Sequence, residues 1–158
     1  MKWFTRTLLI TLALSVPATA VQADGHLGKA VKARKAYMQL LAFNLGQLGA
    51  MAKGKAPYDA GQATLFATNL QLATQMNNSA MWPEGTDNAA MPGKTRALPV
   101  AWEAWPEIGN KNKELAIAAG TLAATAAEGL EILQAGVRGV GKTCRSCHKK
   151  FRAPKKKK

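Results

Sequence analysis

The pentapeptide at residues 144–148, which ends ten residues before the C-terminus, holds the side chains best suited to chemistry in this sequence. It reads Cys144-Arg145-Ser146-Cys147-His148. On a helix, two cysteines three residues apart lie on one face, and the imidazole that follows can turn toward an iron atom. Cys-x-x-Cys-His is the attachment signature of c-type haem, in which each sulfur forms a thioether with a vinyl group. The motif predicts one covalently bound haem c with His148 as the proximal iron ligand.

Three other kinds of site use similar residues. A structural zinc site normally needs four ligands, and the only other His or Cys in the chain is His26. A thioredoxin-like dithiol needs a βαβ setting, and no segment alternates with the period of a strand. A structural disulfide is possible in an exported protein, but it would leave His148 without a role. These alternatives stand beside covalent haem.

The N-terminus predicts a secretory signal peptide. Lys2 and Arg6 precede an apolar run at residues 8–16, and the small residues that follow end in Val21-Gln22-Ala23, which fits a cleavage site. The apolar run is too short for a membrane anchor. We therefore expect a signal peptide over residues 1–23, a single mature domain over 24–158 with a basic C-terminal tail and no membrane span, and a periplasmic location.

The chain is strongly basic. Its 22 Lys and Arg against 9 Asp and Glu give a formal net charge of +13, which falls to +11 without Lys2 and Arg6. For an exported protein this charge favours acidic protein partners over nucleic acid, although anionic lipid or solubility would also explain it. The lysines at 155–158 are either a steering element or a solvated tail.

Hydrophobic periodicity predicts four helices and no strand. We expect helices over 27–53, from an N-cap at Asp59 to about 77, from 99 or 100 to a break at Gly129, and from 130 to about 152. The residues expected on their apolar seams are Val31, Arg34, Met38, Leu41, Leu45, Leu48 and Ala52; Ala63, Phe66, Leu70 and Ala73; Trp105, Ile108, Asn112, Leu115, Ala119, Leu122 and Ala126; and Leu130, Leu133, Val137, Val140, Cys144, Cys147 and Phe151.

The links between these helices predict how they are arranged. The first and third links are short, whereas residues 78–98 are rich in Pro, Gly, Asn and Asp and form a long loop. This pattern indicates an all-α, antiparallel four-helix bundle with both cysteines on the apolar stripe of the last helix. Gly136, Gly139 and Gly141 in that helix suggest close helix packing or room for a large flat group.

Over essentially the whole mature chain, the sequence resembles the class II cytochromes c. The resemblance rests on residues 144–152, the helical stretch 34–38, residues 52–60 and the loop Trp82-Pro83-Glu84-Gly85-Thr86. It implies a four-helix bundle with haem c attached near the C-terminus.

Two subgroups share this bundle. In cytochromes c′ the iron is five-coordinate and high-spin, and the proteins bind nitric oxide or carbon monoxide. In the low-spin subgroup a methionine of the first helix is the sixth ligand, and the proteins look like electron carriers. Met38 occupies that position here, and Tyr37-Met38 and residues 48–54 look more like the low-spin subgroup. The resemblance therefore favours a one-electron carrier with iron bound by His148 and Met38, with an open-site cytochrome c′ as the alternative.

The position of Met38 along its helix agrees with a place near the iron. In an antiparallel bundle the start of the first helix lies beside the end of the last. Met38 is ~16 Å into the first helix and Met51 is ~36 Å in, too far from His148. Met76, Met81 and Met91 stay possible on axial height, and a Met on a helix seam is often only a core residue.

The resemblance also places other side chains near the haem. Arg34 would pair with a propionate or extend to the surface. Arg152 would lie near the proximal haem face or be a solvated charge. Trp82 and Phe151 would be haem-packing or core aromatics. No distal acid or base is evident, so we expect no enzyme activity other than slight peroxidase activity of an open haem iron. Partners would be periplasmic redox proteins with acidic docking surfaces, and the first two helices are a possible homodimer interface.

Overall fold

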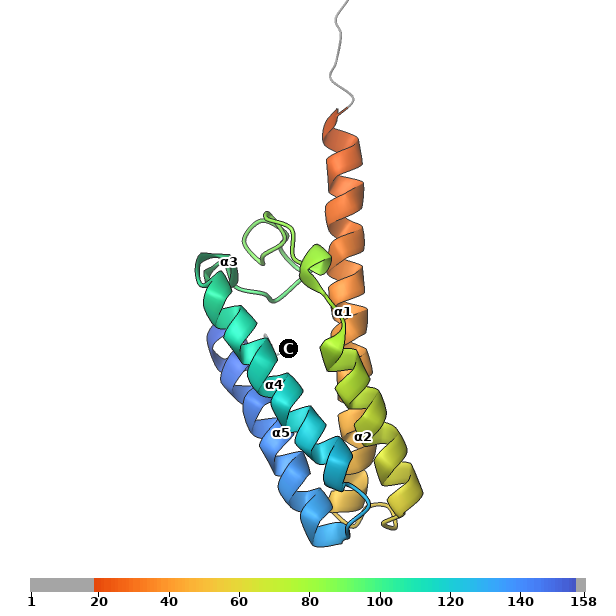
Figure 1. Ribbon diagram of the computed structural model, residues 1–158. Coiled ribbons are helices and arrows are strands. Elements are labelled where there is room, and N and C mark those ends of the chain that lie inside the picture. Colours follow the sequence, from red (N-terminus) through yellow and green to blue (C-terminus); the bar gives the residue numbers. More distant parts are fainter. Residues whose placement is uncertain (1–18, 156–158) are drawn as a thin grey trace, which may run out of the picture.

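The structure, a computed structural model, describes residues 19–155, with side chains described from Gly25 onward. Its helices are α1 (Thr19–Ala52), α2 (Ala60–Gln75), the 3₁₀ helix η1 (Ser79–Met81), α3 (Val100–Glu103), α4 (Trp105–Thr125) and α5 (Leu130–Phe151). Helices α1, α2, α4 and α5 form an antiparallel bundle, as predicted (Figure 1). Most of the predicted signal peptide, residues 1–18, and tail residues 156–158 lie outside the described residues.

The first helix is longer than its periodicity predicts. α1 begins at Thr19 rather than near residue 27, because Gly25 and Gly28 weaken a helix without breaking it. The N-terminal half of α1 extends beyond the bundle, whereas α2 runs beside its C-terminal half (Figure 1). α2 begins where the sequence indicates: the Asp59 Oδ1 accepts a 2.7 Å hydrogen bond from the backbone N–H of Gln62.

The main core is built from the predicted seams of all four long helices. Its fully buried large side chains are Leu48 of α1, Leu70 of α2, Leu122 of α4, and Leu133 and Val140 of α5. Burial of these apolar surfaces provides the main driving force for assembling the bundle. Among the described residues, no helix combines the length and apolar character needed to cross a membrane.

The third predicted helix was wrong in two respects. It is interrupted at Ala104, which has φ −106° and ψ 39°, so α3 is a separate turn and α4 begins at Trp105. Pro106 lacks a backbone N–H and therefore suits a helix start better than a helix interior. Trp105 and Asn112, which we placed on the seam, are exposed, as is Leu130 at the start of α5. Trp105 and Leu130 are the first residues of their helices, where neighbouring helices do not cover both sides, whereas Asn112 is a polar residue inside α4 whose exposure contradicts the predicted seam.

Only one of the three glycines singled out in α5 is required by close helix packing. A Cβ added to Gly136 would lie 2.6 Å from Cδ1 of the fully buried Leu122, so α4 and α5 are closely packed there. A Cβ on Gly139 would meet nothing within 4 Å, and one on Gly141 would meet the Arg145 guanidinium. Of the two expected reasons for these glycines, close helix packing is therefore confirmed at Gly136 and absent at Gly139, and room for a large flat group stays a prediction.

Candidate haem-binding site

The two cysteines of the motif lie between two apolar clusters. Both are free thiols and half-buried on α5. Cys144 packs against the main core, whereas Cys147 packs against a second cluster built on Ala101, Ile108 and Phe151. Burial is the main cause that raises the pKa of both thiols. Both sulfurs therefore belong to α5 and lie at the end of the bundle that meets the long loop, residues 78–98.

His148 lies beside a cavity of about 480 Å³ that Cys144 also lines. Four cationic side chains also line it, namely Arg96, Arg145, Lys149 and Arg152. Burial, and secondly the charge of Arg96, lowers the pKa of His148 and so favours the neutral imidazole, the form that binds a metal. Guanidinium groups are strong partners for carboxylates such as those of a haem. His148 and Arg152 therefore line one cavity, and their roles beside a haem stay predictions.

The other readings of the motif fit the structure less well. In the described part of the chain, no three His, Cys, Asp or Glu side chains lie close enough together to hold a metal ion by themselves. His26, the remaining candidate for a zinc ligand, is exposed on α1. The dithiol reading needs a βαβ unit, whereas residues 19–155 form helices, turns and one isolated bridge between Ala97 and Arg152.

Arg34 is buried and fastens the long loop to α1. It is 4% exposed, so of the two alternatives expected for it, the one in which it extends to the surface was wrong. One terminal nitrogen donates to the carbonyl of Met81 (3.2 Å) and to Oγ1 of Thr86 (3.1 Å), and the other donates to the carbonyl of Thr86 (2.7 Å) and to Oγ1 of Thr95 (3.1 Å). All four acceptors are uncharged. Burial lowers the pKa of Arg34, and pairing with a haem propionate stays a prediction.

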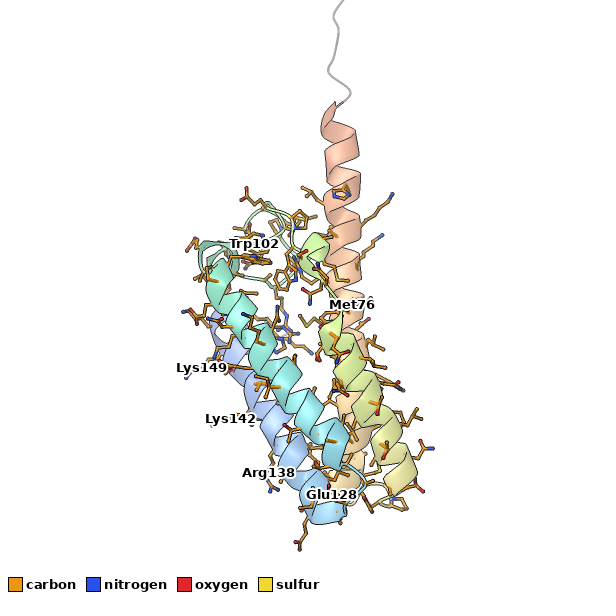
Figure 2. All side chains as sticks on the ribbon, viewed as in Figure 1. Met76, Trp102, Glu128, Arg138, Lys142 and Lys149 are labelled. Atoms are coloured by element: carbon orange, nitrogen blue, oxygen red, sulfur yellow. The ribbon has the colours of Figure 1, made fainter. Side chains whose placement is uncertain are left out.

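The tryptophans pack around this guanidinium. The Arg34 guanidinium carbon lies 4.5 Å from the ring centroid of Trp82 and 5.5 Å from that of Trp102. The indole of Trp102 donates a 3.0 Å hydrogen bond to the carbonyl of Trp82, and Figure 2 places Trp102 at the loop end of the bundle. Trp82 and Trp102 pack against the same cluster as Cys147 and the buried Phe151. The predicted residues Trp82 and Phe151 therefore lie beside the attachment site.

Met38 is partly buried and packs against the main core, as Cys144 does. Met51 is a core residue at 5% exposure, in agreement with its exclusion as a ligand. Met76 is 44% exposed at the end of α2 (Figure 2). A core-filling role for Met38 accounts for this packing, and nothing in it requires a bond to iron.

Two residues at the loop end of the bundle, Thr86 and Arg96, were not singled out as site residues from the sequence. Thr86 is fully buried, and its hydroxyl donates to the Pro83 carbonyl while accepting from Arg34. Its place in the loop 82–86 was a usable signal. Arg96 donates to the carbonyl of Ala153, which is 57 residues away in sequence, so no local pattern announces the contact.

Comparison with known proteins agrees with this arrangement. The family described as "Cytochrome C'" matches residues 29–152. A cytochrome c′ of Cereibacter sphaeroides is 38% identical over 147 residues, which cover 93% of this chain and 97% of the relative. A cytochrome c-554 of the same organism is 31% identical and covers 92% of this chain and 94% of its own.

Solved structures show the same fold. A cytochrome c′ from Rhodobacter Spheriodes superposes with a TM-score of 0.79 and 36% identity over 82% of this chain and 98% of its own. A ferrous variant of cytochrome c prime from Alcaligenes xylosoxidans, described with bound NO, superposes with a TM-score of 0.70 and 28% identity. The match covers 82% of this chain and 97% of that one. A cytochrome c′ described as having ligand-controlled dimer dissociation superposes with a TM-score of 0.74 and 28% identity. The match covers 81% of this chain and 97% of that one.

The donor set fits haem c, which proteins of this family bind covalently. Cys144 and Cys147 are free to form the thioethers, the imidazole of His148 is adjacent, and cationic side chains line the cavity beside it. The low-spin, methionine-ligated subgroup, which we favoured from the sequence, is not supported, because most of the relatives are cytochromes c′. With its bundle, its attachment motif and a family match over residues 29–152, the chain belongs to the cytochrome c′ family.

Proposed function

We propose that this protein is a periplasmic, high-spin cytochrome c′ whose iron is bound by His148 and is open on the opposite face to nitric oxide or carbon monoxide. The observation that carries the proposal is the packing of Met38 against the main core, together with the prevalence of cytochromes c′ among the relatives. The proposed role is ligand binding and one-electron exchange rather than catalysis. The periplasmic location rests on the signal pattern in residues 1–23.

In this proposal each side chain has a limited task. When bound, the haem supplies an iron atom that changes oxidation state by one electron and binds a small diatomic ligand. Cys144 and Cys147 would hold the group on α5, and the neutral imidazole of His148 would bind its iron. Arg34, which has only uncharged hydrogen-bond acceptors, would gain an anionic partner from a propionate, and Arg96 and Arg152 would contribute positive charge beside His148.

The choice between Met38 as a packing residue and Met38 as a ligand can be tested with absorption spectra of the purified haem protein. We expect a high-spin spectrum at neutral pH, ready binding of carbon monoxide to the ferrous protein, and the same spin state in Met38→Ala. Removing a partly buried side chain would change only access to the iron, so carbon monoxide should bind faster in the variant.

The matched control is Met51→Ala, which removes the same side chain from the core at the C-terminal end of α1, further from the attachment motif. It should lower the free energy of unfolding by about 2–5 kcal/mol without changing ligand binding. A low-spin ferrous wild type that becomes high-spin only in Met38→Ala would contradict the proposal and restore the electron carrier with a Met38–iron bond.

We also propose that α1 and α2 form a homodimer interface. Four large apolar side chains are about half exposed on these helices, namely Leu40 (48%), Phe43 (58%), Leu65 (49%) and Leu72 (57%). Phe43 and Phe66 join the two helices by an edge-on contact, with ring centroids 6.1 Å apart. Exposed apolar residues gathered on adjacent helices are typical of an association surface.

A further inference from the structure

Five exposed cations form a continuous row along the haem-attachment helix. Arg138, Lys142, Arg145, Lys149 and Arg152 recur in steps of four and three residues along α5 and its C-cap, and all five are exposed. We call them the cationic stripe. Figure 2 shows Arg138, Lys142 and Lys149 along α5 on the side away from α1 and α2. At 1.5 Å per residue, the helical part from Arg138 to Lys149 is about 16 Å long.

No member of the stripe forms an ion pair in the described part of the chain, and the nearby Glu114 is paired with Lys111. Within residues 19–155, the two ion pairs join Lys111 to Glu114 and Lys150 to Glu107, and neither includes a member of the stripe. Like charges three or four residues apart on a helix repel one another and weaken it. A partner that brings carboxylates to this face would therefore relieve that repulsion as well as gain contacts.

The stripe also reaches the proposed redox centre. Arg145, Lys149 and Arg152 line the same cavity as Cys144 and His148. Beside Lys142, a groove between α4 and α5 holds Ile117, whose side chain is 71% exposed. A charged rim around an apolar contact is the usual composition of a transient protein interface. Electron transfer weakens steeply with distance, so a partner docked here would approach the haem by a short route.

From these observations we infer that the cationic stripe of α5 is the docking face for a small acidic redox protein that exchanges electrons with the haem. This inference rests on the proposed haem function. A membrane surface fits the stripe less well, because the apolar face of α5 is buried in the bundle and is not free to enter a lipid layer. A surface of this kind governs the rate of encounter more than the affinity.

The test compares two double variants with the same change in net charge. Arg138→Glu/Lys142→Glu alters the part of the stripe that does not line the cavity beside His148, and Lys53→Glu/Lys55→Glu alters exposed lysines at the turn between α1 and α2. The probe is flavodoxin hydroquinone, a small acidic flavin protein. It loses one electron to become the semiquinone, while ferric haem becomes ferrous. The second-order rate constant is measured under anaerobic conditions, from the stopped-flow absorbance of the ferrous haem as it forms.

At an ionic strength of about 10 mM, we expect the rate constant of the stripe variant to be at least about fivefold lower than that of wild type. The rate constant of the control variant should be much closer to the wild-type value. At high salt the three rates should converge, because screening removes the steering. Unchanged absorption spectra and midpoint potentials in both variants would show that the haem itself is intact.

Equal slowing in both variants would overturn the docking face, because net charge alone would then explain the rates. A second result would also overturn it. The wild-type protein would bind vesicles containing phosphatidylglycerol, only the stripe variant would lose that binding, and the electron-transfer rates would be unchanged. A wild-type haem that accepts no electron from the flavin would instead count against the proposed one-electron function.

Discussion

Arg34 is the residue whose surroundings differ most from those usual for its type. A guanidinium that is 4% exposed normally has an anionic partner, yet its four hydrogen bonds reach uncharged oxygens of Met81, Thr86 and Thr95. Trp82 and Trp102 cover its faces. Arg34 thereby ties the loop that carries Trp82 to α1, at the same end of the bundle as the attachment motif.

Replacing Arg34 with Leu should lower the free energy of unfolding by about 3 kcal/mol, because buried acceptors such as the Thr86 carbonyl lose a charged donor. Urea unfolding of the haem protein measures this. The exposed Arg138→Leu is the matched control and should change stability by less than ~0.5 kcal/mol. Equal effects of the two substitutions would show that the loop is not held by Arg34.

At the scale of helices, α4 and α5 are closely packed at Gly136, which has no side chain. Leu122 of α4 fills the space above Gly136 of α5 and is fully buried, so it has little room to move. Gly139, one turn further along, has no neighbour within 4 Å of a built Cβ. The two glycines therefore provide a matched pair in one helix.

We expect Gly136→Ala to destabilise the protein by about 1–3 kcal/mol, because the added methyl group overpacks the contact with Leu122. Gly139→Ala should instead stabilise it by up to ~1 kcal/mol, because alanine has the higher helix propensity and meets no obstacle. Thermal unfolding of both variants checks the signs. A stabilising Gly136→Ala would mean that Leu122 can rearrange without cost.

For the whole molecule, the two faces of the bundle have different surfaces. The α1–α2 side exposes Leu40, Phe43, Leu65 and Leu72, whereas the outer side of α5 exposes the cationic stripe. Dimerisation through α1 and α2 would leave α5 accessible for a redox partner. The two proposed interfaces are therefore compatible in one assembly.

Sedimentation velocity at tens of micromolar protein should show a dimer, and Phe43→Glu should shift it to monomer because a charge would be buried at the interface. Ile117→Glu places the same charge on an even more exposed apolar residue of α4 and should leave the dimer intact. A wild-type protein that stays monomeric throughout this concentration range would reject the proposed interface.

The sequence alone determined the features that depend on near neighbours. The motif Cys144 to His148 specifies its cofactor chemistry within five residues, and the Asp59 cap needs only the backbone three residues later. Helical periodicity identified the four long helices and most of the core, because it records which face of each helix avoids water. The break at Ala104 escaped this reasoning, since one non-helical residue barely changes the pattern.

Only the tertiary structure decided which distant residues meet. Arg34 and Thr86 are 52 residues apart in sequence, and Arg96 and Ala153 are 57 apart. Their contacts depend on how the loop crosses the end of the bundle, which a helical period does not encode. The burial of Arg34 and the exposure of Trp105 follow from that path. Periodicity indicates which side chains are buried, but the packing of neighbouring segments determines which atoms each buried side chain contacts.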